Sequence, residues 1–236
     1  MTLMKGIGKV GVVLTLAVAF ATASAAKAEA AMMIRLTQGP NIVTVTDEGV
    51  GDACSGVQGC LTFSGAVGVY FVNVSTGLSK PVFPNSPSFA KMDLNSVNTS
   101  NAAGALKIEL TDNNFVGQHP GVFTGNVGGT TNGTASFEAY KNDSNVLFDI
   151  ASPEAALTLG PFPSGPFSDS ASQTHGALGP YSITLIANIS HAGGVRTTSF
   201  DFEVVNVPEP ATLGLFGLGL AGASIAARRR KRTMAN

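Results

Sequence analysis

The middle of the chain alternates apolar and polar residues with a period of two, which predicts β-strands with one buried and one exposed face. The alternation is clearest at 106–110, 181–190 and 200–204, where apolar side chains are separated by charged or small polar ones. Further strands are predicted at 34–37, 42–47, 60–64, 67–74, 91–97, 121–127, 134–140 and 146–150.

Gly, Asn, Asp and Ser cluster between these segments, as they do in tight turns. Roughly ten short strands separated by turns predict an all-β fold, an antiparallel β-sandwich of jelly-roll or immunoglobulin-like kind. A solenoid needs a fixed repeat, and the chain has none. The stretch 152–180 carries five prolines and four glycines. It is predicted to be a long loop with at most one short element, either functional or disordered.

The N-terminus predicts a secretory signal peptide in residues 1–30. Lys5 and Lys9 precede an apolar stretch, and Ala-x-Ala patterns follow it. This order is typical of an exported precursor, with cleavage after Ala25, Ala28 or Ala30. An uncleaved N-terminal anchor is the alternative, although the apolar stretch is short for a bilayer span.

A second apolar run occupies residues 211–227 near the C-terminus. As a helix its 17 residues cover about 25 Å, the short end of what crosses a bilayer. The alternative is a buried soluble helix, but the run lacks a polar face and contains four glycines, each costing about 1 kcal/mol against Ala in water. Five cations follow and are expected to stop translocation and hold the tail 228–236 in the cytoplasm: Arg228, Arg229, Arg230, Lys231 and Arg232.

A short motif, Val207-Pro208-Glu209-Pro210, precedes this apolar run. A Pro-Glu-Pro tripeptide followed by a Gly-rich apolar segment and an Arg-rich end resembles the C-terminus of bacterial PEP-CTERM proteins, a motif also catalogued as an ice-binding protein C-terminal domain. The resemblance implies recognition by an exosortase, a membrane-embedded cysteine-peptidase-like enzyme. Removal of the tail would follow transient anchoring in the inner membrane and release the protein to the cell surface or an extracellular polysaccharide matrix.

These signals divide the chain into a signal peptide (1–30), a β-sandwich ectodomain (31–206) and a sorting signal (207–236). The ectodomain has the length of one domain. The whole chain has a net charge of −1, but the ectodomain holds six basic residues against thirteen acidic ones, a net charge of −7. Such a body offers no basic stripe, so we expect no nucleic-acid partner.

The two cysteines, Cys54 and Cys60, are separated by a Gly-containing turn. In the oxidising envelope they are predicted to form a disulfide, which would contribute about 2 kcal/mol by loop-closure entropy. The alternative is a redox or metal-binding pair, but the spacing is not Cys-x-x-Cys and no second pair exists.

The densest acidic cluster, Asp47, Glu48 and Asp52, surrounds two glycines. Carboxylate oxygens on a flexible turn are ligands that calcium prefers, so the cluster is a candidate calcium site. A solvated acidic turn is the alternative, and no cofactor is expected.

Catalytic motifs are missing from the sequence: it has no Gly-x-Ser-x-Gly, His-Glu-x-x-His, Walker or EF-hand pattern. The histidines, His119, His175 and His191, are expected to be solvated or at strand edges. We therefore predict no catalytic residue and no enzyme.

Two functional classes remain for an exported body of this kind. One is a non-enzymatic surface or extracellular-matrix protein. The other is a carbohydrate-binding module for exopolysaccharide, with loops at one end of the sandwich forming the site. Tyr70, Tyr140 or Tyr181 would stack on sugar rings if exposed, whereas the alternative is that they are core or half-buried strand tyrosines. An envelope hydrolase is a third class.

Overall fold

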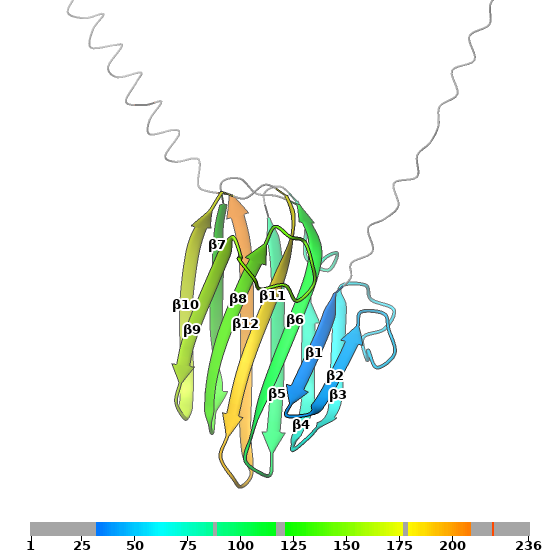
Figure 1. The fold of residues 1–236 in the computed structure, drawn as a ribbon, viewed down its shortest axis with the longest axis vertical. Helices are drawn as coiled ribbons and strands as arrows, with labels where there is room; N and C mark the ends of the chain where they lie inside the picture. The colour runs from blue at the N-terminus through cyan, green and yellow to red at the C-terminus, as the bar shows by residue number, and fades with distance from the viewer. Residues whose placement is uncertain (1–31, 87–88, 117–120, 177–178, 209–218, 220–236) are drawn as a thin grey trace, which may run out of the picture.

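The computed structural model describes residues 32–86, 89–116, 121–176, 179–208 and 219. The described residues form two six-stranded antiparallel sheets that pack face to face (Figure 1). Sheet A has the order β2-β1-β6-β11-β8-β9, and sheet B the order β10-β7-β12-β5-β4-β3. The strands are β1 (Met33–Gln38), β2 (Asn41–Thr46), β3 (Cys60–Val67), β4 (Tyr70–Leu78), β5 (Ala90–Ser100), β6 (Gly104–Val116), β7 (Gly121–Thr131), β8 (Thr134–Asn142), β9 (Ala155–Phe162), β10 (Gly165–His175), β11 (Pro180–His191) and β12 (Arg196–Pro208).

The sandwich forms because the strands turn alternate residues inward. β5 shows this along its whole length, with every second residue buried. The two inner faces supply a core of aliphatic and aromatic side chains. Near its centre the Phe137 ring lies 4.9 Å from that of Phe200 and 5.4 Å from that of Phe202, centroid to centroid, so aromatic contacts join sheet A to sheet B.

Strands β5 to β12 pair in a nested order. β8 pairs with β9, β7 with β10, β6 with β11 and β5 with β12. The chain from Ala90 to Pro208 is therefore one long ribbon that doubles back between β8 and β9 and wraps into both sheets. β1 and β2 extend sheet A beyond β6, and β3 and β4 extend sheet B beyond β5.

The all-β antiparallel sandwich is confirmed, as are the strands predicted at 106–110, 181–190 and 200–204. The strand predicted at 67–74 spans the turn between β3 and β4. The strand predicted at 146–150 is wrong: these residues lie in the connection between β8 and β9. There Phe148 has φ +59°, a left-handed conformation that an extended strand excludes.

The loop predicted at 152–180 is also wrong, because β9 and β10 fill most of it. β9 is an edge strand of sheet A and β10 an edge strand of sheet B. Edge strands tolerate proline, since an edge residue needs no N–H donor on its outer side. Pro161 lies near the end of β9 and Pro166 near the start of β10. The prolines therefore mark edges of the sandwich.

The predicted signal peptide (1–30), membrane helix (211–227) and basic tail (228–236) lie outside the described residues, apart from the single residue 219. Within the described part of the chain, no helix has the length and apolar character that a bilayer crossing requires.

Candidate functional site

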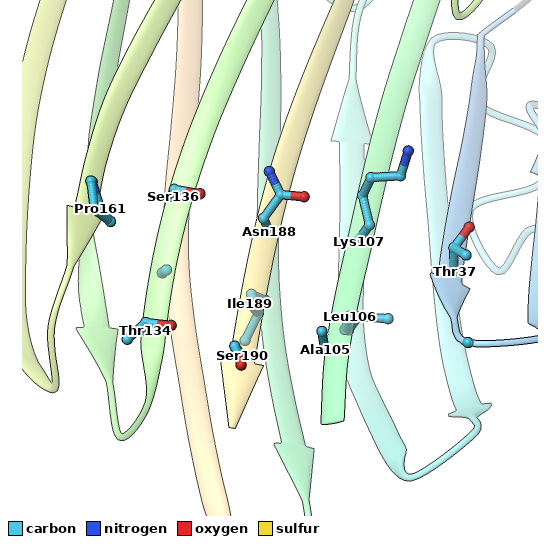
Figure 2. Close-up of a pocket in the computed structure, with 12 residues that line it drawn as sticks. Thr37, Ala105, Leu106, Lys107, Thr134, Ser136, Pro161, Asn188, Ile189 and Ser190 are labelled. Carbon is cyan, nitrogen blue, oxygen red and sulfur yellow. The ribbon is translucent and has the colours of Figure 1, made fainter. Parts of the chain in front are cut away.

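A shallow depression of about 340 Å³ lies on the outer face of sheet A (Figure 2). Its lining comes from β1 and the turn after it, β6, β11, β8 and β9, and it mixes polar side chains with apolar residues and glycine. The outward side chains include Thr37, Lys107, Ser136, Asn188 and Ser190. In the register of the sheet, Asn188 lies between Ser136 and Lys107, so the floor presents a row of hydrogen-bonding groups across three strands.

Lys107 is held in place by a charged cluster next to the depression. Its Nζ lies 3.0 Å from Glu109 Oε1, and Arg35 Nε lies 2.7 Å from Glu109 Oε2. Burial acts to raise the pKa of Glu109, but hydrogen bonds from Arg35 and Lys107 outweigh it and hold that pKa below its usual value. The two cations therefore hold the Glu109 carboxylate in place, and the Lys107 side chain remains 42% exposed.

The upper part of the same face is covered by the connection between β8 and β9. The backbone N–H of Phe148 donates to Thr111 Oγ1 at 3.1 Å, and the Arg35 guanidinium lies 4.1 Å from the centre of the Phe148 ring. Asn145 Nδ2 donates to Asn114 Oδ1 at 2.8 Å. The connection between β8 and β9 therefore covers this part of the face, and the depression lies on the part that it leaves uncovered.

The tyrosines divide between core and surface. Tyr70 and Tyr181 are 1% and 0% exposed, so the core alternative is correct for both and neither ring can stack on a sugar. Tyr140 is half-buried on β8, facing outward on the same side as Ser136. Its hydroxyl donates to Glu138 Oε2 at 2.6 Å, which fixes the ring on this outer face, four residues along β8 from Ser136.

The acidic turn folds around the disulfide and covers an edge of sheet B. The predicted bond between Cys54 and Cys60 is confirmed. Asp52 Oδ1 accepts hydrogen bonds from the backbone N–H groups of Cys54 (2.8 Å) and Thr62 (2.9 Å), and the N–H of Ala53 donates to the carbonyl of Thr62 at 2.8 Å. Thr62 belongs to β3, the edge strand. The turn thus occupies backbone N–H and C=O groups of β3 that could otherwise pair with another strand.

The other two carboxylates of this cluster also bind backbone. Asp47 Oδ2 accepts from the N–H of Gly59 at 2.7 Å, and Glu48 Oε1 accepts from the N–H of Gly56 at 3.0 Å. Burial, together with the charges of Asp52 and Glu48, raises the pKa of Asp47 despite its hydrogen bond from Gly59. Within the described ranges, no three or more His, Cys, Asp or Glu side chains are grouped so that they could hold a metal ion.

His191 is the last residue of β11, as the sequence predicted, but the predicted solvation is wrong for it, because it is 2% exposed. Its Nδ1 lies 2.7 Å from Ser100 Oγ and its Nε2 2.8 Å from Thr198 Oγ1, and its ring lies 5.1 Å from that of Tyr70. Burial lowers the pKa of this imidazole, and Arg196 lowers it further. A serine nucleophile must reach its substrate, and Ser100 is buried. We therefore interpret the group as a structural bridge between the sheets.

His175 is buried as well, at the opposite end of the sandwich, and His119 lies outside the described residues. The Nε2 of His175 lies 2.7 Å from Asn206 Oδ1, and Asn206 Nδ2 donates to the Tyr181 hydroxyl at 2.9 Å. Sequence reasoning missed this group because its members come from β10, β11 and β12. The sequence signal that could have found this group is Asn206, a polar residue at a position of β12 where the alternation predicts an inward-facing apolar one.

The sorting residues lie directly after this group. Val207 and Pro208 are the last residues of β12, opposite Val122 and Gly121 of β7. Glu209, Pro210 and the cations Arg228 to Arg232 lie outside the described residues.

Comparison with solved structures finds only weak likeness. TmCBM61, solved in complex with β-1,4-galactotriose, has 7% identity and a TM-score of 0.31 over 59% of this chain and 90% of its own. The K1 cleaved adhesin domain of Lys-gingipain from Porphyromonas gingivalis W83 has 9% identity and a TM-score of 0.28 over 64% of this chain and 98% of its own. Scores at this level carry no argument about function. No curated protein matches the chain.

Comparison with family models gives a specific result at the C-terminus. Residues 206–231 match the PEP-CTERM protein-sorting motif. The match covers the Pro-Glu-Pro tripeptide and most of the basic end, and it confirms the resemblance predicted from the sequence. The chain therefore carries a PEP-CTERM protein-sorting motif, attached directly to the last strand of a β-sandwich.

Proposed function

We propose that the chain is a non-enzymatic exported surface or extracellular-matrix protein that an exosortase sorts and releases. The observation that carries this proposal is the sorting-motif match at 206–231. The disulfide between Cys54 and Cys60 also supports it, because such bonds persist outside the reducing cytosol.

In this proposal the two ends of the chain serve transport. Residues 1–30 act as the signal peptide, and residues 211–227 anchor the precursor transiently in the inner membrane. The cations of 228–232 keep the short tail on the cytoplasmic side. The nested pairing of β5 to β12 supports a body of the jelly-roll kind rather than the immunoglobulin-like kind.

Replacement of the central residue of the tripeptide tests the sorting step. In a host with an active exosortase, Glu209→Ala is expected to leave the protein in the inner-membrane fraction, whereas wild type reaches the surface or medium. Glu154→Ala is the matched control, because Glu154 is an exposed carboxylate on the body. Equal release of the Glu209→Ala and wild-type proteins would refute the proposal.

A second candidate function is carbohydrate binding at the depression on sheet A. The row of Ser136, Asn188 and Lys107 offers both donors and acceptors to sugar hydroxyls, and the half-buried Tyr140 presents part of a ring on the same face. The site would then lie on a sheet face and not in the end loops expected from the sequence.

Glycan binding of the exported protein tests this second function. Asn188→Ala and Tyr140→Ala are each expected to lower the affinity for a bound glycan by about tenfold, which corresponds to a loss of about 1.4 kcal/mol of binding free energy. Asn126→Ala, on the outer face of sheet B, is the matched control and should bind as wild type does. Binding that survives both substitutions on sheet A would exclude the depression.

A further inference from the structure

The sorting motif does not begin after the folded body; it begins inside it. The matched segment starts at Asn206, and its first three residues belong to β12. β12 is an interior strand of sheet B, between β5 and β7. Asn206 lies opposite Ala90 on one side and Phe123 on the other, and the pairing with β7 continues to Pro208. The motif and the sandwich therefore share these residues.

Side chains lock the end of β12 in place. Asn206 is 0% exposed, and its amide lies within hydrogen-bonding distance of His175 Nε2 (2.7 Å) and the Tyr181 hydroxyl (2.9 Å). The Tyr181 ring stacks on that of Phe115 at 5.6 Å. Side chains from two other strands, β10 of sheet B and β11 of sheet A, thus hold one amide of β12, and releasing it would leave buried polar groups unsatisfied.

The packing around this clamp, formed by Asn206, His175 and Tyr181, is tight. At Gly121, which lies opposite both Pro208 and His175, a Cβ atom would meet His175 Nε2 at 2.7 Å and the carbonyl oxygen of Val207 at 3.2 Å. Only glycine fits at that point without displacing the imidazole or the strand. The end of β12 is consequently fixed by shape as well as by hydrogen bonds.

A peptidase needs access to the backbone on both sides of the bond that it cuts. Backbone groups of Thr198 to Asn206 are engaged by β5 and β7, so cleavage there requires local opening of an interior strand. We infer that the exosortase engages the chain only beyond Asn206 and cuts a peptide bond C-terminal to Pro208. The mature protein then keeps β12 complete, and the sandwich itself sets the upstream limit of processing.

This inference rests on the proposed function for the identity of the peptidase, but the protection of β12 does not depend on it. The net reaction is hydrolysis with one water molecule. The C–N bond breaks, the hydroxyl of the water joins the carbonyl carbon as the new C-terminal carboxyl of the body, and its hydrogen joins the amine of the released tail. No oxidant or reductant is needed.

The first test identifies the C-terminal peptide of the protein released by a host with an active exosortase. The expected C-terminal residue is Pro208 or one beyond it. A released protein that ends at Val207 or earlier would overturn the inference while leaving the sorting function intact.

The second test is independent of the exosortase and uses the unprocessed full chain in detergent. Limited digestion with a protease of broad specificity is expected to cut first beyond Pro208. Asn206→Ala should move the upstream limit of cutting into β12, whereas Asn126→Ala, an exposed Asn of the same sheet, should not. Wild-type cutting within 198–206 as fast as in the tail would overturn the inference, even if no release occurs in the host.

Discussion

β12 contacts a buried histidine at each of its two ends, and the two ends differ in the segment of chain to which they connect. At its start, Thr198 contacts His191, which also contacts Ser100 and whose ring lies 5.1 Å from that of Tyr70. At its end, Asn206 contacts His175 and the stacked Tyr181. Both groups join β11 of sheet A to strands of sheet B.

The connections give the two contacts different roles. A short connection joins the end of β11 to the start of β12, where Thr198 lies. The His191 group therefore only ties the two sheets together. At the other end, Asn206 is itself the first residue of the matched sorting motif. The same kind of polar bridge therefore lies near the start of β12 at one end, and at the other it holds the residue at which the sorting motif begins.

The largest expected effect is at the His191 end. His191→Ala removes a buried ring and leaves Ser100 and Thr198 without their imidazole partner, so it should lower the free energy of unfolding by about 2–4 kcal/mol. Urea unfolding of the exported protein measures this. Ser190→Ala, at the exposed neighbouring position, should change it little. The site of processing should stay the same, and a shifted processing site would break the comparison.

The next effect is at the Asn206 end. Asn206→Ala should lower the free energy of unfolding by about 1–3 kcal/mol, because a buried imidazole and a buried hydroxyl lose their shared partner. Unlike His191→Ala, it should also make the end of β12 sensitive to protease. Two variants that lose stability without differing in protease sensitivity would show that the two ends are equivalent.

A smaller effect sharpens the role of Tyr181. Tyr181→Phe keeps the ring on Phe115 but removes the hydroxyl that accepts from Asn206, so a loss of about 1 kcal/mol is expected. Thermal unfolding should show a slightly lower midpoint. A loss as large as that of Asn206→Ala would place the main contribution of the clamp on the tyrosine hydroxyl.

The smallest effect is the pH dependence of the His191 end. Burial lowers the pKa of His191 in the folded protein, so the unfolded chain binds the proton more readily. The contribution of His191 to the free energy of unfolding is therefore fully present above the ordinary histidine pKa of about 6.5. It is lost as the pH falls through the folded-state pKa.

His191→Gln isolates this dependence. The stability advantage of wild type over His191→Gln should shrink as the pH is lowered from 7.5 to 5.5 in urea titrations. Comparison with the variant is needed because burial and the neighbouring Asp201 raise the pKa of Asp93 to about 6, and this carboxyl titrates in the same range with the opposite sign. An advantage that grows on acidification would contradict the assignment.

The sequence predicted the parts of the fold that depend on local pattern. Period-two alternation identified β6, β11 and β12, where inward residues such as Ile183 and Phe202 alternate with polar ones. It failed for β9 and β10 because their prolines were interpreted as loop signals. At the two edges of the sandwich, Pro161 and Pro166 sacrifice no interior hydrogen bond. Whether a strand lies at an edge depends on the assembled sheets and is not visible in local sequence.

The candidate site was predicted less completely. The disulfide between Cys54 and Cys60 and the sorting motif were visible because each is contiguous in the chain. The depression on sheet A was not, since Lys107, Ser136 and Asn188 become neighbours only through the pairing of β6, β11 and β8. The buried histidines were missed for the same reason, because their partners are contributed by distant strands.

Amide hydrogen exchange of the full chain in detergent tests the central claim most directly. If β12 is a paired interior strand up to the sorting motif, the amides of Thr198 to Asn206 should exchange slowly and as one unit, while the amides beyond Pro208 should not share their protection. Rapid exchange at Val205 and Asn206 in the wild-type protein would contradict the account, because the sandwich would then end before the motif begins.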